Sequence, residues 1–107
     1  MVTELSPTEL QEKLDTGTDV ALLDIRDPEA FADGHIPGSE NRPAQRLDAS
    51  VFDEEWPDEI VVSCYIGKSS KRIAEILDTN LAADVTSLRG GFDAWEGPVE
   101  SGHSVSE

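Results

Sequence analysis

Three short segments of this chain have the character of β-strands, and segments with helix signals separate them. The segments 20–25 and 60–64 are almost wholly apolar, and 84–88 is a third strand-like segment. Apolar runs of this length are typical of strands that are buried on both faces, as in a parallel sheet. Because these strands alternate with helices, the sequence predicts an α/β fold with a parallel sheet between helices, joined by right-handed crossovers.

The strongest helix signal lies near the start of the chain. Ser6 can cap a helix whose first residue is Pro7, and Glu9 completes a capping box. Gly17 supplies a stop for this helix. We therefore expect one amphipathic helix before the first buried strand.

Other segments carry shorter or less regular helix signals. Asp27 can cap a short helix over 28–31, and helical spacing of apolar residues predicts a longer helix from 70 to 81. A last short helix is expected over 92–95. The segment 39–58 is predicted to form one loose helix or turn, because four of its apolar residues fall on one face at helical spacing. These four are Leu47, Val51, Phe52 and Trp56.

The chain has the size of one ordinary domain. Its 107 residues, of which 37% are hydrophobic, can bury one core. We expect a single domain over 1–107, with a core over about 4–100 and a frayed polar tail over 101–107. No apolar run approaches the ~20 residues that span a bilayer. The first residues lack the basic and apolar regions of a secretory signal, so we expect a cytoplasmic protein.

The acidic composition excludes two classes of partner. The chain has 23 acidic and 8 basic residues, and its formal net charge is -15. Such a field repels nucleic acid and anionic membranes, so we expect neither as a partner. The scarcity of lysine also resembles proteins adapted to high intracellular salt, where ions screen the self-repulsion. This halophilic hypothesis predicts greater stability in molar potassium chloride than in dilute buffer.

Cys64 is the only cysteine, so any cysteine chemistry uses one sulfur. An intramolecular disulfide, a cysteine-only metal site and a two-cysteine redox cycle within one chain are excluded. The sequence contains no metal-ligand constellation and no dinucleotide-binding glycine motif. We predict neither a metal nor a cofactor.

Cys64 stands where the second apolar strand ends, before the longer helix. Ligand sites of open α/β sheets lie at the carboxyl ends of strands, and a loop into a helix can point several backbone N–H groups inward. Gly67 permits the bend. An ordinary thiol pKa of about 8.5 is lowered at a helix N-terminus, which favours the nucleophilic thiolate. Lys68, Lys71 and Arg72 form a basic cluster that can attract anionic substrates.

Here the sequence resembles a known family. The segment 64–70, Cys-Tyr-Ile-Gly-Lys-Ser-Ser, resembles the active-site loop of single-domain rhodaneses, which begins at the cysteine. The segment 23–39, with Leu-Asp-Ile-Arg-Asp-Pro-Glu and Gly-His-Ile-Pro-Gly-Ser, is similar to the family's upstream signature. The segment 88–95, Leu-Arg-Gly-Gly-Phe-Asp-Ala-Trp, is similar to its closing signature. The three stand in the family's order and spacing, and the resemblance covers roughly 4–100.

The resemblance implies a three-layer α/β/α architecture with a five-stranded parallel sheet, and a ping-pong sulfurtransferase. In that reaction Cys64 takes a sulfane sulfur from a donor such as thiosulfate. It then passes the sulfur, held as a persulfide, to cyanide, a thiol or a protein. The catalytic role carries over to Cys64. The residues expected to bind the substrate are Tyr65, Ile66, Gly67, Lys68, Ser69 and Ser70.

This loop differs from two related loops. Certain thiosulfate-using rhodaneses have basic residues where this chain has Tyr65 and Ile66, and Lys68 compensates in part. Related phosphatases have an arginine six places after the cysteine, where this chain has Ser70, so no arginine can clamp a phosphate. Two alternatives to a small-molecule sulfurtransferase stay open. They are a protein-to-protein sulfur carrier in tRNA thiolation or cofactor assembly, and a non-catalytic binding module.

Several side chains have both a structural and a functional interpretation. Asp24 and Arg26 either line the pocket or support the loops through an ion pair, and we favour the second. His35 stands in a Gly-His-Ile-Pro-Gly turn, where a structural hydrogen bond is favoured over a role as general base. Tyr65 is expected to be exposed and to contact substrate or a partner. The serines of the loop can donate to the sulfur or cap the following helix.

Overall fold

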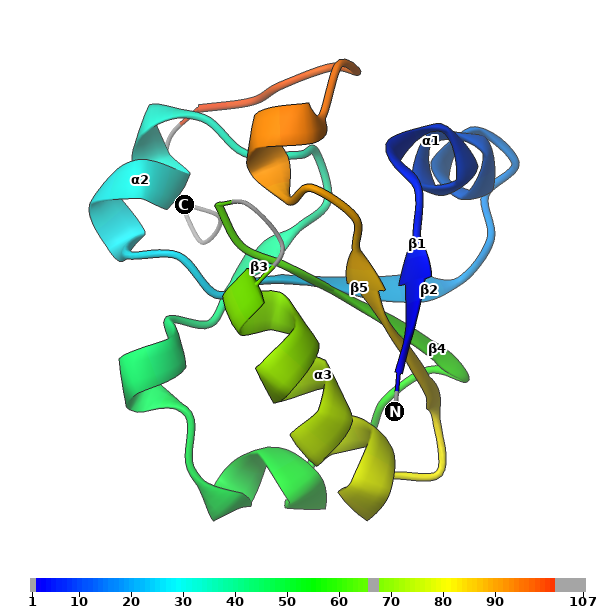
Figure 1. Ribbon diagram of the computed structural model, residues 1–107, viewed down its shortest axis with the longest axis vertical. Coiled ribbons are helices and arrows are strands. Elements are labelled where there is room, and N and C mark those ends of the chain that lie inside the picture. Colours follow the sequence, from blue (N-terminus) through cyan, green and yellow to red (C-terminus); the bar gives the residue numbers. More distant parts are fainter. Residues whose placement is uncertain (1, 66–67, 102–107) are drawn as a thin grey trace.

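The predicted parallel sheet is present and has five strands. The computed structural model describes residues 2–65 and 68–101. The strand order is β1-β5-β4-β2-β3, and every neighbouring pair is parallel (Figure 1). The strands are β1 (Thr3–Leu5), β2 (Val20–Asp24), β3 (Glu40–Asn41), β4 (Glu59–Ser63) and β5 (Asp84–Leu88). Because the strands are parallel, the residues that follow β2, β4 and β5 lie at the same edge of the sheet.

Helices cover both faces of this sheet. They are α1 (Pro7–Asp15), α2 (Pro28–Asp33), α3 (Lys68–Asn80) and the 3-10 helices η1 (Ala44–Arg46), η2 (Ala49–Asp53) and η3 (Phe92–Ala94). Side chains of α3 and of the η1–η2 segment pack with Ile60 and Val62 in one cluster. Side chains of α1 and η3 pack with Val61 in a second cluster. Because neighbouring residues of a strand face opposite sides of a sheet, the two clusters lie on opposite faces. The molecule therefore has the three-layer α/β/α arrangement that the resemblance implied.

The three strand-like segments of the sequence correspond to β2, β4 and β5. The two remaining strands lie at the edges of the sheet and have no strand pattern of their own, because β1 has three residues and β3 has two. They are strands because they pair with β5 and β2, which are distant in sequence. No helix in the described ranges is long and apolar enough to cross a bilayer.

The predicted cap of the first helix is confirmed. The Ser6 hydroxyl accepts a hydrogen bond from the Glu9 amide at 3.1 Å, and the Glu9 carboxylate accepts one from the Ser6 amide at 2.9 Å. The bond from the Ser6 amide is the main reason why the pKa of Glu9 is lowered, since it favours the ionised carboxylate. Gly17 follows the helix with a φ of 75°, as a C-terminal stop requires.

Two other helices differ in detail from the prediction. Asp27 occupies the N-cap position of α2, but its side chain makes no capping hydrogen bond. This helix continues to Asp33, beyond the predicted end at Phe31. The helix predicted over 70–81 is confirmed as α3, although Ile76, one of the apolar residues at helical spacing, is exposed.

The prediction of one loose helix over 39–58 is wrong. The segment holds β3, η1 and η2 instead. The side chain of Asp48 accepts a hydrogen bond from the Ser50 amide at 3.0 Å and thereby caps the start of η2. The four apolar residues at helical spacing still pack into the cluster beneath α3. Spacing therefore identified which side chains are buried, but not the path of the backbone between them.

Candidate active site

Cys64 follows β4 directly and lies at the carboxyl edge of the sheet. Because β4 is flanked by β2 and β5, this position is central in the sheet, and Cys64 is buried. The chain then enters α3 at Lys68, so the expected strand–loop–helix connection is present. Of the predicted substrate-binding residues, Ile66 and Gly67 and the side chain of Lys68 lie outside the described part of the structure.

Ser70 contacts the sulfur through two groups. Its backbone nitrogen and its Oγ each lie 3.4 Å from Cys64 Sγ. Since α3 begins at Lys68, Ser70 lies in the first turn of this helix, where the backbone N–H groups carry the positive end of the helix dipole. The hydroxyl of Ser70 is therefore directed to the sulfur and does not occupy the N-cap position. Ser69, the neighbouring serine of the loop, is exposed.

A second buried serine extends this contact. The Oγ of Ser70 lies 2.6 Å from the Oγ of Ser87 on β5, and both side chains are fully buried. A hydroxyl can donate and accept, so the direction of this chain of bonds can reverse. When Cys64 is a thiol, its S–H group donates a hydrogen bond to the Ser70 hydroxyl. When Cys64 is a thiolate, the Ser70 hydroxyl donates to the sulfur, and the Ser87 hydroxyl donates to Ser70. The two hydroxyls can therefore stabilise a negative charge on Cys64 without leaving a buried group unpaired.

The turn after β5 binds the backbone carbonyl groups of Cys64 and Tyr65. The Phe92 amide donates to the Cys64 carbonyl at 2.7 Å, and the next amide donates to the Tyr65 carbonyl at 3.0 Å. Gly91 precedes these amides with a φ of 62°. A Cβ atom at Gly91 would lie 2.4 Å from the Cys64 carbonyl oxygen, so a residue with a side chain cannot approach this closely. The closing signature thus acts on the site by fixing the backbone at Cys64.

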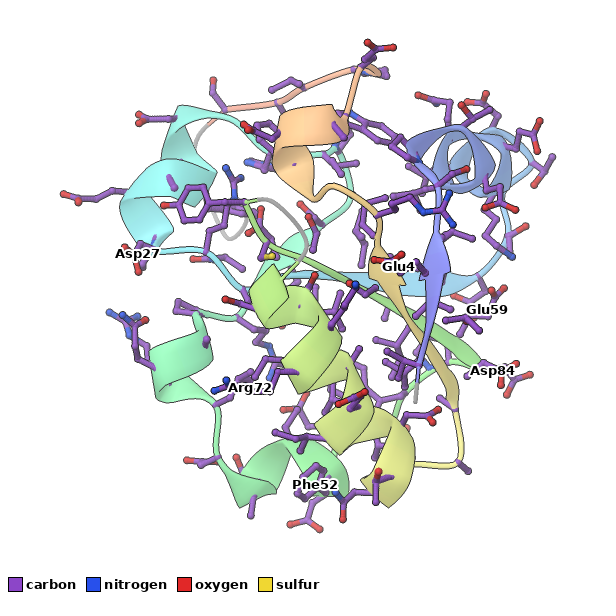
Figure 2. The ribbon with its side chains drawn as sticks, viewed as in Figure 1. Glu4, Asp27, Phe52, Glu59, Arg72 and Asp84 are labelled. Carbon is purple, nitrogen blue, oxygen red and sulfur yellow. The ribbon has the colours of Figure 1, made fainter. Side chains whose placement is uncertain are left out.

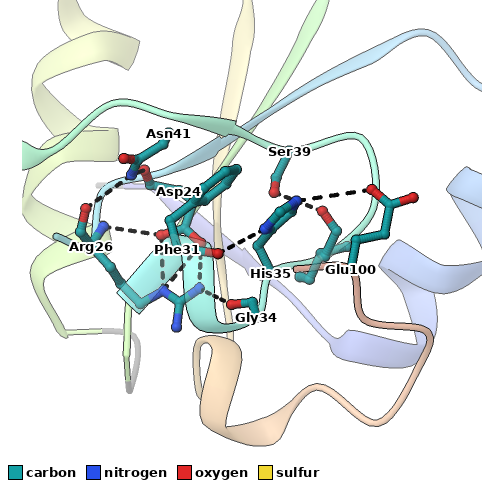
Figure 3. A network of polar contacts seen from close by, with 9 residues as sticks. Asp24, Arg26, Phe31, Gly34, His35, Ser39, Asn41 and Glu100 are labelled. Carbon is teal, nitrogen blue, oxygen red and sulfur yellow. Dashed lines mark hydrogen bonds and ion pairs between the residues drawn. The ribbon is translucent and has the colours of Figure 1, made fainter. Parts of the chain in front are cut away.

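Asp24 and Arg26 form a buried ion pair beside the loop (Figure 3). Arg26 Nε lies 3.0 Å from Asp24 Oδ1, and Nη2 lies 2.8 Å from Oδ2. Nη2 also donates to the carbonyl of Gly34 at 2.7 Å. Asn41 donates to the backbone carbonyls of both residues of the pair at 3.0 Å. The pair therefore ties the end of β2 to the exit of α2 and to β3.

The same arginine also faces the active-site loop. Its guanidinium carbon lies 4.2 Å from the centre of the Phe92 ring and 5.6 Å from that of Tyr65. The ring of Tyr65 is exposed, as the sequence predicted. Arg26 thus supports the loops, as the favoured interpretation of the sequence requires, and it also lines the space beside Tyr65.

His35 has a structural setting. Its Nδ1 lies 2.8 Å from the Phe31 carbonyl oxygen, and its ring stacks on that of Phe31 with a centroid separation of 3.8 Å. Its backbone pairs with Glu100 through two hydrogen bonds of 2.8 Å. This buried histidine therefore anchors the segment that returns after η3, as the favoured interpretation of the sequence requires.

The basic cluster beside the loop is divided. Lys71 Nζ lies 3.2 Å from a carboxylate oxygen of Glu4, so its charge is directed towards β1. Arg72 extends from α3 on the side of η1 (Figure 2). There it lines, with Ser69 and Ala44, a hollow of about 280 Å³. Of these two side chains, Arg72 is the one placed beside the start of α3 to attract an anion.

Comparison of the sequence with known domains shows the family to which the chain belongs. The profile of the rhodanese-like domain matches residues 6–98. The chain belongs to the rhodanese-like domain family. Among curated members, thiosulfate sulfurtransferase GlpE of Pseudoalteromonas translucida is 41% identical over 78 residues, which are 73% of this chain and 74% of that protein. Thiosulfate sulfurtransferase GlpE of Ectopseudomonas mendocina is 37% identical over 97 residues, 91% of this chain and 87% of that protein. The similarity to these relatives identifies the chain as a sulfurtransferase of the rhodanese type.

The solved structures agree with this family. A rhodanese-related protein from Thermoplasma volcanium superposes with a TM-score of 0.80 at 25% identity, covering 92% of this chain and 97% of that one. The similarity extends over almost the whole of both chains. The rhodanese fold expected from the three signatures is thus confirmed.

Proposed function

We propose that this rhodanese moves a sulfane sulfur from a donor such as thiosulfate to a thiophilic acceptor through a persulfide on Cys64. The observation that carries the proposal is the contact of Cys64 Sγ with both the amide and the hydroxyl of Ser70 at the first turn of α3. Donors in this position stabilise a thiolate, which is the nucleophilic form of the residue. The curated relatives, whose name includes thiosulfate, support the choice of donor.

The reaction balances with one sulfur nucleophile. The Cys64 thiolate attacks the sulfane sulfur of thiosulfate, a sulfur–sulfur bond forms to Cys64, and the bond within thiosulfate breaks. Sulfite leaves with the electron pair. Cyanide or a thiolate then attacks the terminal sulfur, and Cys64 leaves as a thiolate. The negative charge lies on Cys64 Sγ in the thiolate and on the terminal sulfur in the persulfide. The donors of Ser70 therefore stabilise Cys64 as the nucleophile of the first half-reaction and as the leaving group of the second. A cytoplasmic location, expected from the sequence, would supply thiol acceptors in the reduced form.

The test of this proposal is the intact mass after exposure to thiosulfate. The protein is incubated with thiosulfate, excess reagent is removed, and the mass is measured beside a Cys64→Ser variant. We expect a gain of one sulfur atom in the native protein, none in the variant, and loss of the added sulfur on treatment with cyanide. If no adduct forms at any salt concentration, small-molecule sulfur transfer is wrong. A carrier loaded by another protein or a non-catalytic module would then take its place.

Replacing Ser70 with alanine is expected to slow sulfur loading by at least about tenfold, because a hydrogen bond to a charged group contributes about 1.5–3 kcal/mol. The substitution removes the hydroxyl at 3.4 Å from Cys64 Sγ and leaves the buried Ser87 hydroxyl without this partner. The rate of loading, and the rate of alkylation by iodoacetamide, are measured as functions of pH. Both profiles should move to higher pH in the variant. Thr79→Ala is the control, since Thr79 is exposed near the other end of α3. Equal profiles for Ser70→Ala and the native protein would contradict the assigned role.

A further inference from the structure

An open groove of about 470 Å³ lies beside the residue that follows Cys64. Its lining includes Arg26, Asp33, Tyr65, Phe92, Asp93 and Val99. These residues come from the end of β2, from α2, from η3 and from the segment that returns past His35. Because Tyr65 adjoins the cysteine in sequence, a molecule bound in the groove would lie next to the mouth of the site.

The groove has two large apolar side chains that are exposed. Three large apolar residues are exposed in the described part of the chain, and two of them, Tyr65 at 51% and Val99 at 53%, line this groove. Exposed apolar surface beside polar groups is typical of a surface that binds a partner. Gly34 lies against Val99, since a Cβ atom there would lie 3.2 Å from the Val99 side chain.

The groove also offers a hydrogen-bond donor from Arg26. Arg26 is 5% exposed, and its Nε and Nη2 are bound to Asp24 and Gly34. Its third nitrogen, Nη1, makes no hydrogen bond with any described residue, and no dashed line reaches it in Figure 3. Because a guanidinium nitrogen can only donate, this N–H group is suited to a carbonyl oxygen of a bound molecule.

The charge of the groove excludes a simple anion. The charge of Arg26 is balanced by Asp24. The carboxylates of Asp33 and Asp93 are exposed, and neither has an ion pair among the described residues. The groove is therefore net negative, as the whole chain is at -15. Thiosulfate is repelled here, whereas a cationic side chain is attracted.

We infer that this groove docks a partner protein that exchanges sulfur with Cys64 and that presents a lysine or arginine close to its own reactive cysteine. The inference rests on the proposed function. The methylene groups of such a side chain can pack on Tyr65 and Val99 while its charge reaches Asp33 or Asp93. A backbone carbonyl of the same segment can accept from Arg26 Nη1. When the partner is the acceptor, its thiolate attacks the terminal sulfur of the Cys64 persulfide. The partner thereby gains the persulfide, and Cys64 leaves as a thiolate.

Two synthetic peptides test the inference with the full chain. Each has one cysteine, and the two are identical except that lysines flank the cysteine in one and glutamates flank it in the other. Native protein, Asp33→Lys and Asp84→Lys are loaded with thiosulfate, and the rate constants of sulfur transfer to each peptide and to cyanide are measured at an ionic strength of about 0.1 M, where the Debye length is about 10 Å. Asp84 is the matched control because it is exposed at the start of β5, on the opposite edge of the sheet from Cys64. Both substitutions change the net charge equally.

We expect the native protein to prefer the lysine peptide. Asp33→Lys should lower the ratio of the lysine rate to the glutamate rate by roughly fivefold, about the effect of two exposed ion pairs. Asp84→Lys should leave the ratio within about twofold of the native value, since charges beyond a Debye length are screened. Asp33 ends α2, where a lysine suits the helix dipole, so the variant should fold. Equal ratios for the two variants would overturn the inference. The cyanide measurement distinguishes failure of this inference from failure of the proposed function. A protein that cannot be loaded with sulfur, or that cyanide cannot discharge, contradicts the proposed function.

Discussion

Replacing Arg26 with methionine is expected to lower the free energy of unfolding by about 3 kcal/mol or more, because it leaves the Asp24 carboxylate buried without its cation. Asp24 and Arg26 are 2% and 5% exposed, so water cannot take the place of the lost partner. The Gly34 carbonyl also loses its donor. The measurement is urea-induced unfolding followed by tryptophan fluorescence, with Trp95 in the core as the reporter.

An exposed ion pair provides the control for this prediction. Arg89 lies 3.5 Å from Glu4 with a side chain that is largely exposed, so Arg89→Met should change the stability by less than about 1 kcal/mol. A double variant, Asp24→Leu with Arg26→Met, should recover part of the loss, since removing both charges avoids the unpaired carboxylate. If Arg26→Met were no more destabilising than Arg89→Met, the buried pair would not be a structural support.

Replacing Gly91 with alanine is expected to displace the cysteine backbone and to reduce sulfur transfer by at least about tenfold, since a small misplacement of a reacting group can cost far more. The added Cβ would lie 2.4 Å from the Cys64 carbonyl oxygen and 2.7 Å from the Tyr65 carbonyl carbon. Both contacts are with backbone, which cannot rotate away as a side chain can. The rate of thiosulfate loading and the free energy of unfolding are to be measured together.

A Gly38→Ala variant separates the effect of the close contact at Gly91 from the effect of a positive φ. It also has a positive φ, of 87°, but a Cβ atom there would meet nothing within 4 Å. Gly38→Ala should therefore cost only the strain of the left-handed conformation, about 1–2 kcal/mol, and should load sulfur at the native rate. A Gly91→Ala variant that loads sulfur as fast as Gly38→Ala would show that the cysteine backbone does not depend on this close approach.

The elements that could be predicted from the sequence are those with local signals. The capping box at Ser6 and Glu9 and the apolar runs of β2 and β4 each depend on neighbouring residues. The same holds for the cysteine between β4 and α3. β1 and β3 could not be predicted from their own residues, because what makes them strands is pairing with distant strands. In 39–58 the spacing indicated burial correctly and the backbone path wrongly.

In the candidate site, the residue that the sequence analysis missed is Ser87. A polar residue two positions after Val85 on a buried strand was the available signal, because both face the same side of the sheet. Its partner could not be deduced, since the contact with Ser70 depends on how α3 crosses β5. The role of Gly91 was likewise beyond local reasoning, which predicts a turn but not which carbonyl the turn approaches.

The pairing of the first strand, β1, with the last one, β5, restricts the order in which the chain can fold during its synthesis. β1 lies beside β5, and the amides that hold the Cys64 and Tyr65 carbonyls come from η3, later still. During synthesis, β2 and β4 can meet early, while the cysteine lacks these amides until the chain has passed η3. A ribosome-bound fragment that ends before η3 should therefore carry Cys64 in an unfinished loop, and these long-range contacts should form late in folding. Any reactivity of Cys64 that depends on these amides therefore requires almost the whole of the domain.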